Sequence, residues 1–236
     1  MDLDHRQVIA VDGPGAAGKS TVANILAGRL GAMLFDTGAL YRAVTLAAVR
    51  RGIPGHDGER LAALARTSRI EIRPASVNDG RQVDVLLDGE DVTWAIRTPE
   101  IDGRVSEVSA HPQVRQELLA VQRQIADGAR VVMVGRDIGT VVAPMAGTKV
   151  FLVASTEERA RRRQRELKGR GVEATYEQVL ADLEARDAVD SGRETAPLAP
   201  AADAVIVDTD DRSVDEIVTD IENLARASWQ AAGVGA

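Results

Sequence analysis

The sequence predicts an α/β fold of three layers, with a five-stranded parallel β-sheet between two layers of helices. Short apolar runs alternate with segments of helical periodicity along most of the chain, which is the order expected of a parallel sheet. The first run leads into a glycine-rich turn that opens a helix. One segment in the first half instead alternates polar and apolar residues, which indicates an inserted antiparallel sheet. The runs expected as parallel strands are 8–11, 32–35, 131–134, 149–153 and 204–208.

A phosphate-binding motif follows the first expected strand. Residues 13–20 fit the pattern G-x-x-x-x-G-K-[ST], the P-loop, in the required context between a strand and a helix. Its glycines let backbone N–H groups turn toward phosphate oxygens, and the helix that follows adds its positive end. Lys19 is expected to reach the β- and γ-phosphates, and the Ser20 hydroxyl is expected to ligate Mg²⁺. The sequence therefore predicts a nucleoside triphosphate site, whose phosphate contacts come from Gly13, Pro14, Gly15, Ala16, Ala17, Gly18, Lys19, Ser20 and Thr21.

The composition excludes several classes of function. A formal net charge of −7 argues against a general nucleic-acid-binding protein, which is usually basic. The chain has no cysteine, so we expect no disulfide, thiolate metal site or cysteine nucleophile. Its three histidines are scattered, and no apolar run is long enough to span a membrane. We expect a cytoplasmic protein with no nucleic-acid or membrane partner.

Helical periodicity fills most segments between the strands. Val22, Ile25, Leu26 and Leu30 recur at helical spacing after the P-loop, and Gly31 is the expected stop. Another helix is expected after a cap at residue 155, and further helices from residue 39 and over 59–66, 98–108, 113–125 and 214–227.

The inserted segment spans residues 69–93. Residues 70–72 and 83–87 alternate apolar and polar side chains, and a turn signal at 78–80 lies between them. A third short strand is expected after a second turn, within 88–92. This small antiparallel sheet does not fit the strand–helix rhythm on either side, so it is interpreted as an insertion.

A run of basic side chains follows the fourth parallel strand. Seven arginines and lysines lie between Arg159 and Arg170, and only Glu166 opposes them there. Such a run forms either a solvated helix face or a lid whose arginines fold over a triphosphate. Because a P-loop is present, we favour the lid, with Gly169 and Gly171 at its flexible end.

Three further arginines, Arg42, Arg136 and Arg193, stand beside expected turns or strand ends. The carboxyl ends of parallel strands border the ligand crevice of such a sheet. Each arginine alone would be an ordinary surface charge, but together at one edge they indicate a second anion. We expect this anion to be a phosphorylated acceptor.

Several motifs besides the P-loop carry a specific resemblance. They are D-T-G-A-L-Y-R at 36–42, L-D-G-E-D-V at 87–92, I-R-T at 96–98, P-Q-V-R at 112–115, G-R-D-I-G-T-V-V at 135–142 and A-P-L at 196–198. Through them the chain resembles the nucleoside monophosphate kinase family of P-loop kinases, and within it the bacterial cytidylate (CMP) kinases. The resemblance extends from about residue 8 to residue 227.

The resemblance implies one P-loop kinase domain over residues 1–227 and a flexible tail over 228–236. The core would comprise about 6–37, 129–156 and 194–227, the monophosphate-binding subdomain about 38–128, and the helical lid about 157–193. The subdomain would carry the small antiparallel sheet. The family resemblance also implies a monomer.

The resemblance assigns a role to each matched site residue. Arg42, Arg136 and Arg193 would hold the acceptor phosphate, and Lys19, Arg136, Arg162 and Arg193 would act on the transferred group. Ser106, Arg115 and Asp137 would read cytosine, and Thr37, Arg186 and Asp190 would lie near the ribose. Tyr41 completes the expected CMP site, and adenine is expected at loop 209–212.

The implied reaction transfers the γ-phosphoryl group of MgATP to CMP or dCMP, giving ADP and CDP or dCDP. A carboxylate and a hydroxyl, from Asp137 and Ser106, suit the N4 amino donor of cytosine, and Arg115 suits its N3 and O2 acceptors. Uracil would present an acceptor to Asp137, at a cost of about 1 to 3 kcal/mol per lost buried hydrogen bond. CMP should therefore be preferred over UMP. No general base is required, because the acceptor is already an anionic phosphate oxygen.

Two positions depart from the family pattern, and the more important one lies before the G-R-D run, while segment 144–146 lacks the usual acidic residue after its proline. Members usually carry an acidic residue directly before the G-R-D run, whereas this chain has Val134. We therefore hypothesise that Asp36 or Asp12 helps to hold the water shell of Mg²⁺.

Two alternative functions stay open. The chain could be a P-loop kinase for another nucleotide, a sugar or a shikimate-like acceptor, although a base-reading subdomain disfavours small acceptors. It could instead be a nucleotide-dependent switch that hydrolyses slowly, although it has no Asn-Lys-x-Asp run to read guanine.

Overall fold

Five parallel strands form the central sheet, in the order β2-β6-β1-β7-β8. The structure is a computed structural model, which describes residues 5–193 and 195–233. The strands are β1 (Val8–Asp12), β2 (Met33–Asp36), β6 (Val131–Val134), β7 (Thr148–Val153) and β8 (Val205–Asp208). The prediction of a five-stranded parallel sheet is confirmed, with every expected strand within one residue of its observed start and end.

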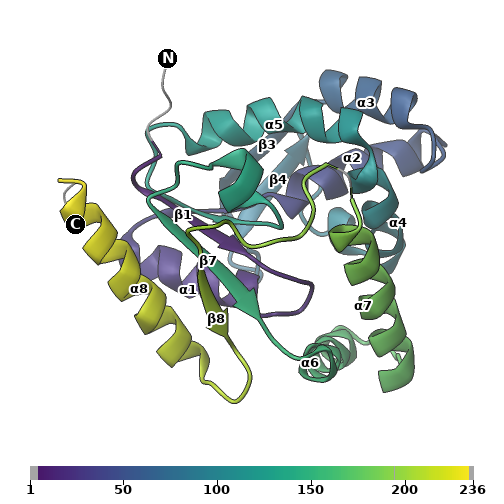
Figure 1. Cartoon of the computed structure of the whole chain (residues 1–236). Helices are drawn as coiled ribbons and strands as arrows, with labels where there is room; N and C mark the ends of the chain where they lie inside the picture. The colour runs from purple at the N-terminus through teal and green to yellow at the C-terminus, as the bar shows by residue number, and fades with distance from the viewer. Residues whose placement is uncertain (1–4, 194, 234–236) are drawn as a thin grey trace.

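Helices cover both faces of this sheet, because the side chains of a buried strand alternate between two apolar layers. Ile9 and Val11 pack with residues of α1 (Lys19–Leu30) and α8 (Val214–Ala231). Val8 and Ala10 face the other layer, which includes residues of α2 (Gly38–Arg50), α3 (Gly58–Thr67) and α5 (Pro112–Ala126). Figure 1 shows α8 and α5 on opposite sides of the sheet. The three-layer prediction is therefore confirmed.

The expected helix boundaries lie within two residues of the observed ones, except at the end of the last helix. Helix α1 ends at Gly31, whose φ of 58° is the left-handed conformation that glycine adopts most easily. Ile25 shares the spacing of the buried α1 residues but is 37% exposed. The break near residue 111 separates α4 (Pro99–Ala110) from α5, since Pro112 starts a new helix at its N-terminal turn.

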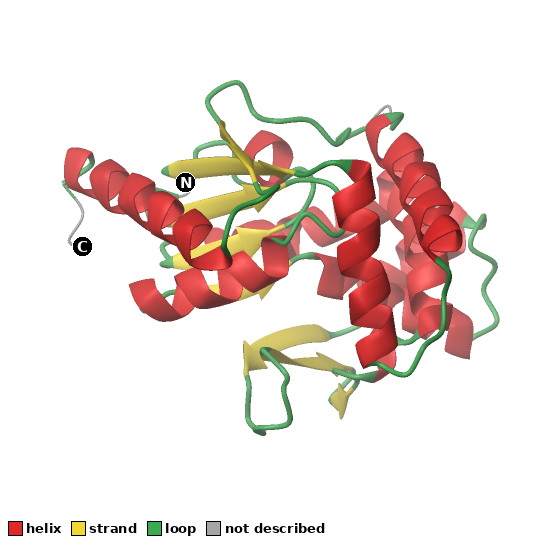
Figure 2. Cartoon of the chain, turned by 90° about the horizontal axis from the view of Figure 1, so that it is seen from below, coloured by secondary structure: helices red, strands yellow, loops and turns green. Residues whose placement is uncertain are grey.

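The small antiparallel sheet is present as predicted. It contains β3 (Ile70–Pro74), β4 (Val83–Leu87) and β5 (Glu90–Asp91) in that order. Alternate β4 residues, Val85 and Leu87 among them, are buried in the same layer as α2. A short 3₁₀ turn, η1 (Ala95–Arg97), leads from β5 toward α4. Figure 2 shows this sheet as a separate unit beside the main one.

Two helices form the segment expected as a lid. The basic helix is α6 (Thr156–Gly169), and it packs side by side with α7 (Tyr176–Ser191) around a small core of Ala160, Val179 and Leu183. Helix α7 begins with a capping box, in which Thr175 and Gln178 bond reciprocally to each other's backbone N–H groups. Helix α7 lies within the range expected for the helical lid, and it also contacts α4.

The expected tail needs a correction at its start. Helix α8 continues to Ala231, beyond the expected end at 227, because Trp229 is fully buried and the guanidinium carbon of Arg130 lies 4.8 Å from its ring centre. Residues 234–236 of the expected tail lie outside the described residues. Across 5–193 and 195–233, no helix has both the length and the apolar character needed to span a bilayer.

Candidate active site

The carboxyl ends of all five parallel strands meet at one edge of the sheet, and the predicted site residues follow directly after them. The P-loop follows β1, residue 37 follows β2, residues 136–137 follow β6, α6 follows β7, and the loop from residue 209 follows β8. This edge is where open parallel sheets bind their ligands. The sheet topology therefore gathers the residues that the motifs selected from distant parts of the chain.

The P-loop lies tightly against the sheet. Gly13 has a φ of 143°, and a Cβ atom at this position would lie 2.3 Å from the carbonyl oxygen of Leu152 on β7. Lys19 folds back over the loop, where its Nζ donates to the Pro14 carbonyl at 2.6 Å. Burial and, after it, the positive charge of Arg136 lower the pKa of Lys19 well below its usual value. An anion bound in the loop would raise this pKa again, because a nearby negative charge favours the protonated ammonium group.

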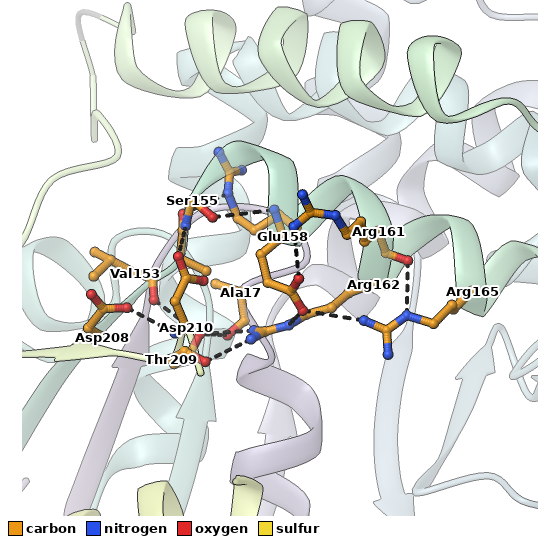
Figure 3. A network of polar contacts seen from close by, with 12 residues as sticks. Ala17, Val153, Ser155, Glu158, Arg161, Arg162, Arg165, Asp208, Thr209 and Asp210 are labelled. Carbon is orange, nitrogen blue, oxygen red and sulfur yellow. Dashed lines mark hydrogen bonds and ion pairs between the residues drawn. The ribbon is translucent and has the colours of Figure 1, made fainter. Parts of the chain in front are cut away.

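The base of helix α6 is tied to the P-loop and to the loop after β8. Buried Arg159 donates to the Gly15 carbonyl at 3.3 Å and pairs with Asp187 of α7 at 2.7 Å. Arg162 donates to both the hydroxyl and the carbonyl of Thr209, at 2.9 and 2.7 Å. Figure 3 shows these contacts from Arg162, with Glu158 holding the same guanidinium from within α6. Arg159 and Arg162 of the basic run therefore connect α6 to neighbouring segments of the protein.

The residues expected to read the base form a buried group. Arg115 lies 2.5 Å from the carboxylate of Asp137, and its guanidinium carbon lies 5.3 Å from the ring centre of Tyr41. All three residues are at most 8% exposed. Arg115 also donates to the carbonyl of Ser109, while the carbonyl of Ser106 accepts from the Ser109 hydroxyl at 3.2 Å. The C-terminal part of helix α4 therefore contacts this buried group through Ser109.

Asp190 joins three of the predicted arginines. It lies 2.8 Å from Nε of Arg136, pairs with Arg193, and is 3.9 Å from Arg186. Its side chain is almost completely buried at the end of α7. Arg136 also donates to the Gly13 carbonyl at 2.6 Å, so it connects this cluster to the P-loop. Burial, followed by the nearby charge of Arg136, lowers the pKa of Arg186 to about 10.

Arg42 bonds to partners other than Asp190. It pairs with Asp102 of α4 and donates to the Ile96 carbonyl at 3.4 Å. Asp102 also binds Arg163 of α6, at 2.9 Å. No motif pointed to Asp102, because its partners come from two other helices.

Asp12, hypothesised from the sequence to help hold the water shell of Mg²⁺, has a structural role in the fold. Its two carboxylate oxygens accept the backbone N–H groups of Ile138 and Gly139, at 2.9 and 2.8 Å. These donors begin a single π-helical turn, η2 (Ile138–Val142), directly after Asp137. Burial raises the pKa of Asp12 to about 6, although both hydrogen bonds oppose this shift. Asp12 thus fixes the loop of Arg136 and Asp137 against the end of β1.

Thr37 and Val134 are joined at the ends of β2 and β6. The hydroxyl and the N–H of Thr37 both donate to the Val134 carbonyl, at 2.9 and 3.0 Å. The side chain of Val134 is buried in the apolar layer of α1 and α8. Its neighbour in register is Asp36, one oxygen of which accepts the Gly38 N–H at 2.9 Å. Asp36 therefore places a carboxylate beside Val134, the position where family members usually carry an acidic residue.

Comparison with known proteins gives a consistent result. The chain matches a family model described as cytidylate kinase over residues 9–227. A cytidylate kinase of Caldanaerobacter subterraneus subsp. tengcongensis is 52% identical over 210 residues, which cover 89% of this chain and 90% of the relative. A cytidylate kinase of Herpetosiphon aurantiacus is 46% identical over 223 residues, which cover 94% of this chain and 96% of the relative. An uncharacterized protein from Eubacterium ventriosum aligns at a TM-score of 0.50 and 12% identity, over 93% of this chain and 98% of that protein, a likeness that bears on the fold alone.

Proposed function

Because the chain belongs to the cytidylate kinase family and is therefore a nucleotide kinase, we propose that it transfers the γ-phosphoryl group of ATP to CMP or dCMP. The products would be ADP and CDP or dCDP. The observation that carries the proposal is the buried Arg115–Asp137 pair, one residue along the chain from Arg136, which contacts the P-loop. The carboxylate proposed to read the base and the arginine that contacts the P-loop are therefore neighbours in the chain.

ATP would bind with its phosphates in the loop from Gly13 to Thr21. Backbone N–H groups and the N-terminus of α1 would stabilise the triphosphate, and Lys19 would leave the Pro14 carbonyl for the β- and γ-phosphates. Adenine would lie near the loop that begins at Thr209. Since Arg162 already contacts this loop, a small movement of α6 would carry its guanidinium toward the transferred group.

The acceptor phosphate would bind to arginines that the fold holds in advance. Arg136 and Arg193 are oriented by Asp190, and Arg42 approaches from α2. Preorganised cations stabilise the charge that develops on a transferred phosphoryl group. The ribose would contact Thr37, Arg186 and Asp190.

Cytosine would be selected by hydrogen-bond polarity. Its N4 amino group would donate to Asp137 and Ser106, and its O2 and N3 would accept from Arg115, with Tyr41 packed below. Uracil would leave a buried carboxylate facing another acceptor, which disfavours UMP. The acceptor phosphate is itself the nucleophile, so catalysis would rest on positioning and charge neutralisation by Lys19, Arg136, Arg162 and Arg193.

The oxygen donors near the P-loop suit Mg²⁺, which prefers hydroxyl, carboxylate and water ligands. We propose that Ser20 and Asp36 hold this ion, because both carboxylate oxygens of Asp12 already accept backbone N–H groups. Bound Mg²⁺ would neutralise charge on the β- and γ-phosphates. Asp36→Asn should then raise the Mg²⁺ concentration needed for half-maximal rate, and Val134→Asp should lower it. An unchanged requirement in both variants would contradict this assignment.

The proposal is tested by ADP release from MgATP with and without CMP. A kinase releases ADP at a rate that depends on the acceptor, whereas a nucleotide-dependent switch hydrolyses ATP at a slow rate that CMP does not change. Formation of CDP should match ADP mole for mole. ADP release indifferent to CMP would overturn the proposal.

A further inference from the structure

Asp102 connects two arginines that belong to different parts of the molecule. One carboxylate oxygen pairs with Arg42 of α2, and the other lies 2.9 Å from Nη2 of Arg163 on α6. The Asp102 side chain is 17% exposed, and those of Arg42 and Arg163 are 23% and 25% exposed. Partly buried charges of this kind are screened less by salt than surface pairs. Burial acts to raise the pKa of Asp102, but the two arginines outweigh it and hold that pKa below its ordinary value.

The hydrogen bonds of Arg42 show how Asp102 sets its orientation. Within the described residues, Arg42 donates from Nη1 to both Asp102 and the Ile96 carbonyl. One edge of the guanidinium is thereby fixed toward α4 and the turn before it. A guanidinium carries five N–H donors in a rigid plane, so fixing one edge sets the direction of the other.

Arg163 is fixed in a similar way from the lid side. Its Nη2 binds Asp102, and its Nη1 lies 2.8 Å from Glu166, one turn further along α6. The bond to Asp102 therefore joins the lid helix to α4 across 61 residues of sequence.

The place of Asp102 on α4 relates it to the acceptor site. Asp102 and Ser106 are four residues apart, so they lie on the same face of the helix, one turn from each other. Ser106 belongs to the pocket proposed for the base, and Asp102 meets an arginine proposed for the phosphate. Helix α4 would thus lie along the bound acceptor, with Ser106 near its base and Asp102 near the arginine of its phosphate.

We propose that Asp102 is a positioning residue, which orients Arg42 for the acceptor phosphate and ties the lid helix α6 to that arginine. The proposal rests on the proposed function in one respect, since it takes Arg42 to be a ligand of the acceptor phosphate. Asp102 itself does not touch the substrate. Both the affinity for the acceptor and the position of α6 would therefore depend on the Asp102 carboxylate.

Steady-state kinetics of Asp102→Asn give the first test, because the amide keeps the shape of the side chain and removes its charge. The KM for CMP should rise about tenfold, as expected for the loss of one charge-assisted hydrogen bond, while the KM for ATP stays within about twofold. Asp102→Glu should restore part of the loss. Glu100→Gln is the matched control, since Glu100 lies on the same helix, is 57% exposed and pairs only loosely with Arg104. A KM for CMP in Asp102→Asn equal to that of the control would overturn the proposal.

A double-mutant cycle with Arg163→Gln tests the tie to the lid. In the otherwise unchanged protein this substitution should lower kcat/KM for CMP about threefold, but in the Asp102→Asn background it should have almost no effect. Arg161→Gln, at an exposed position of α6, is the control. Fully additive effects of the Asp102 and Arg163 substitutions would contradict the tie.

Amide hydrogen exchange of the protein without nucleotide separates the two levels of the argument. Asp102→Asn and Arg163→Gln should speed exchange in α6 and leave α8 unchanged, whether or not CMP is the acceptor. If the unsubstituted protein fails to phosphorylate CMP, the proposed function is wrong, and faster exchange in α6 still supports the tie. If CMP is phosphorylated normally and Asp102→Asn alters neither the kinetics nor the exchange, the inference about Asp102 alone is wrong.

Discussion

The guanidinium of Arg115 lies 2.5 Å from the carboxylate of Asp137, and both side chains are buried at the edge of the sheet where the P-loop begins. A buried ion pair of this kind contributes little net stability, because desolvation offsets most of the attraction. The pair instead fixes the positions of one hydrogen-bond acceptor and one group of donors. One acceptor and one planar donor stand side by side, as the proposed function requires for the N4, N3 and O2 positions of cytosine.

Asp137→Asn should weaken the discrimination between CMP and UMP. An amide offers an N–H donor to the O4 of uracil, so the ratio of the two kcat/KM values should fall by roughly tenfold to a hundredfold. The measurement is kcat/KM for both nucleotides in the variant and in the unsubstituted protein. Asp182→Asn, at an exposed position of α7, should leave the ratio unchanged. An unaltered ratio in Asp137→Asn would show that the carboxylate does not read the base.

Two glycine-to-alanine substitutions should have opposite effects on stability. Gly28 lies inside α1 with no atom within 4 Å of an added Cβ, so Gly28→Ala should raise the free energy of unfolding by about 1 kcal/mol. Gly13→Ala would place a methyl group 2.3 Å from the Leu152 carbonyl oxygen, at a positive φ that alanine rarely adopts. It should destabilise the protein and abolish ATP binding. Urea unfolding and nucleotide titration of both variants check this pair, and a fully active Gly13→Ala protein would be inconsistent with the P-loop geometry.

The stability supplied by Asp12 should decrease as pH rises. Its pKa is raised from 3.8 to about 6, so the folded state binds this proton more tightly than the unfolded chain does. The associated stability is fully present at a pH below the pKa of Asp12 in the unfolded chain. It is lost as pH rises through the pKa of Asp12 in the folded protein. The difference in unfolding free energy between the unsubstituted protein and Asp12→Asn should therefore shrink by about 1 kcal/mol between pH 5 and pH 7.5. A difference that is constant or grows with pH would contradict the burial of this carboxyl group.

Trp229→Ala should cost about 3 to 5 kcal/mol of unfolding free energy, the usual effect of removing a fully buried large aromatic side chain. Trp94 is 48% exposed, so Trp94→Ala should cost much less. Thermal or urea unfolding of the two variants makes the comparison. Equal costs would mean that the end of α8 does not belong to the core.

The main elements of the fold could be predicted because their signals are local. Strands β1 and β6 are short apolar runs buried on both faces, and Ser155 and Ser213 each accept the helix N–H group that a cap requires. Helix α7 has a weaker signal, since only Val179, Leu183 and Asp190 of its 16 residues are buried. Its apolar contacts with α6 are few, so periodicity alone gives little sign of it.

The site could be predicted at the level of motifs but not at the level of partners. Lys19, Arg136 and Asp137 stand in recognisable runs, whereas the ion pair of Arg136 with Asp190 spans 54 residues and depends on how α7 meets the sheet. Asp102 is a similar case. Its sequence neighbours give no hint that two other helices each place an arginine on it.

Formation of ADP from MgATP with CMP, dCMP, UMP, AMP and shikimate, measured in parallel, tests the central claim most directly. The account predicts rapid turnover with CMP and dCMP, weak turnover with UMP and none with AMP or shikimate. Rapid turnover with AMP or shikimate, or a slow release of ADP that no acceptor changes, would contradict the assignment of the Arg115–Asp137 pocket to cytosine.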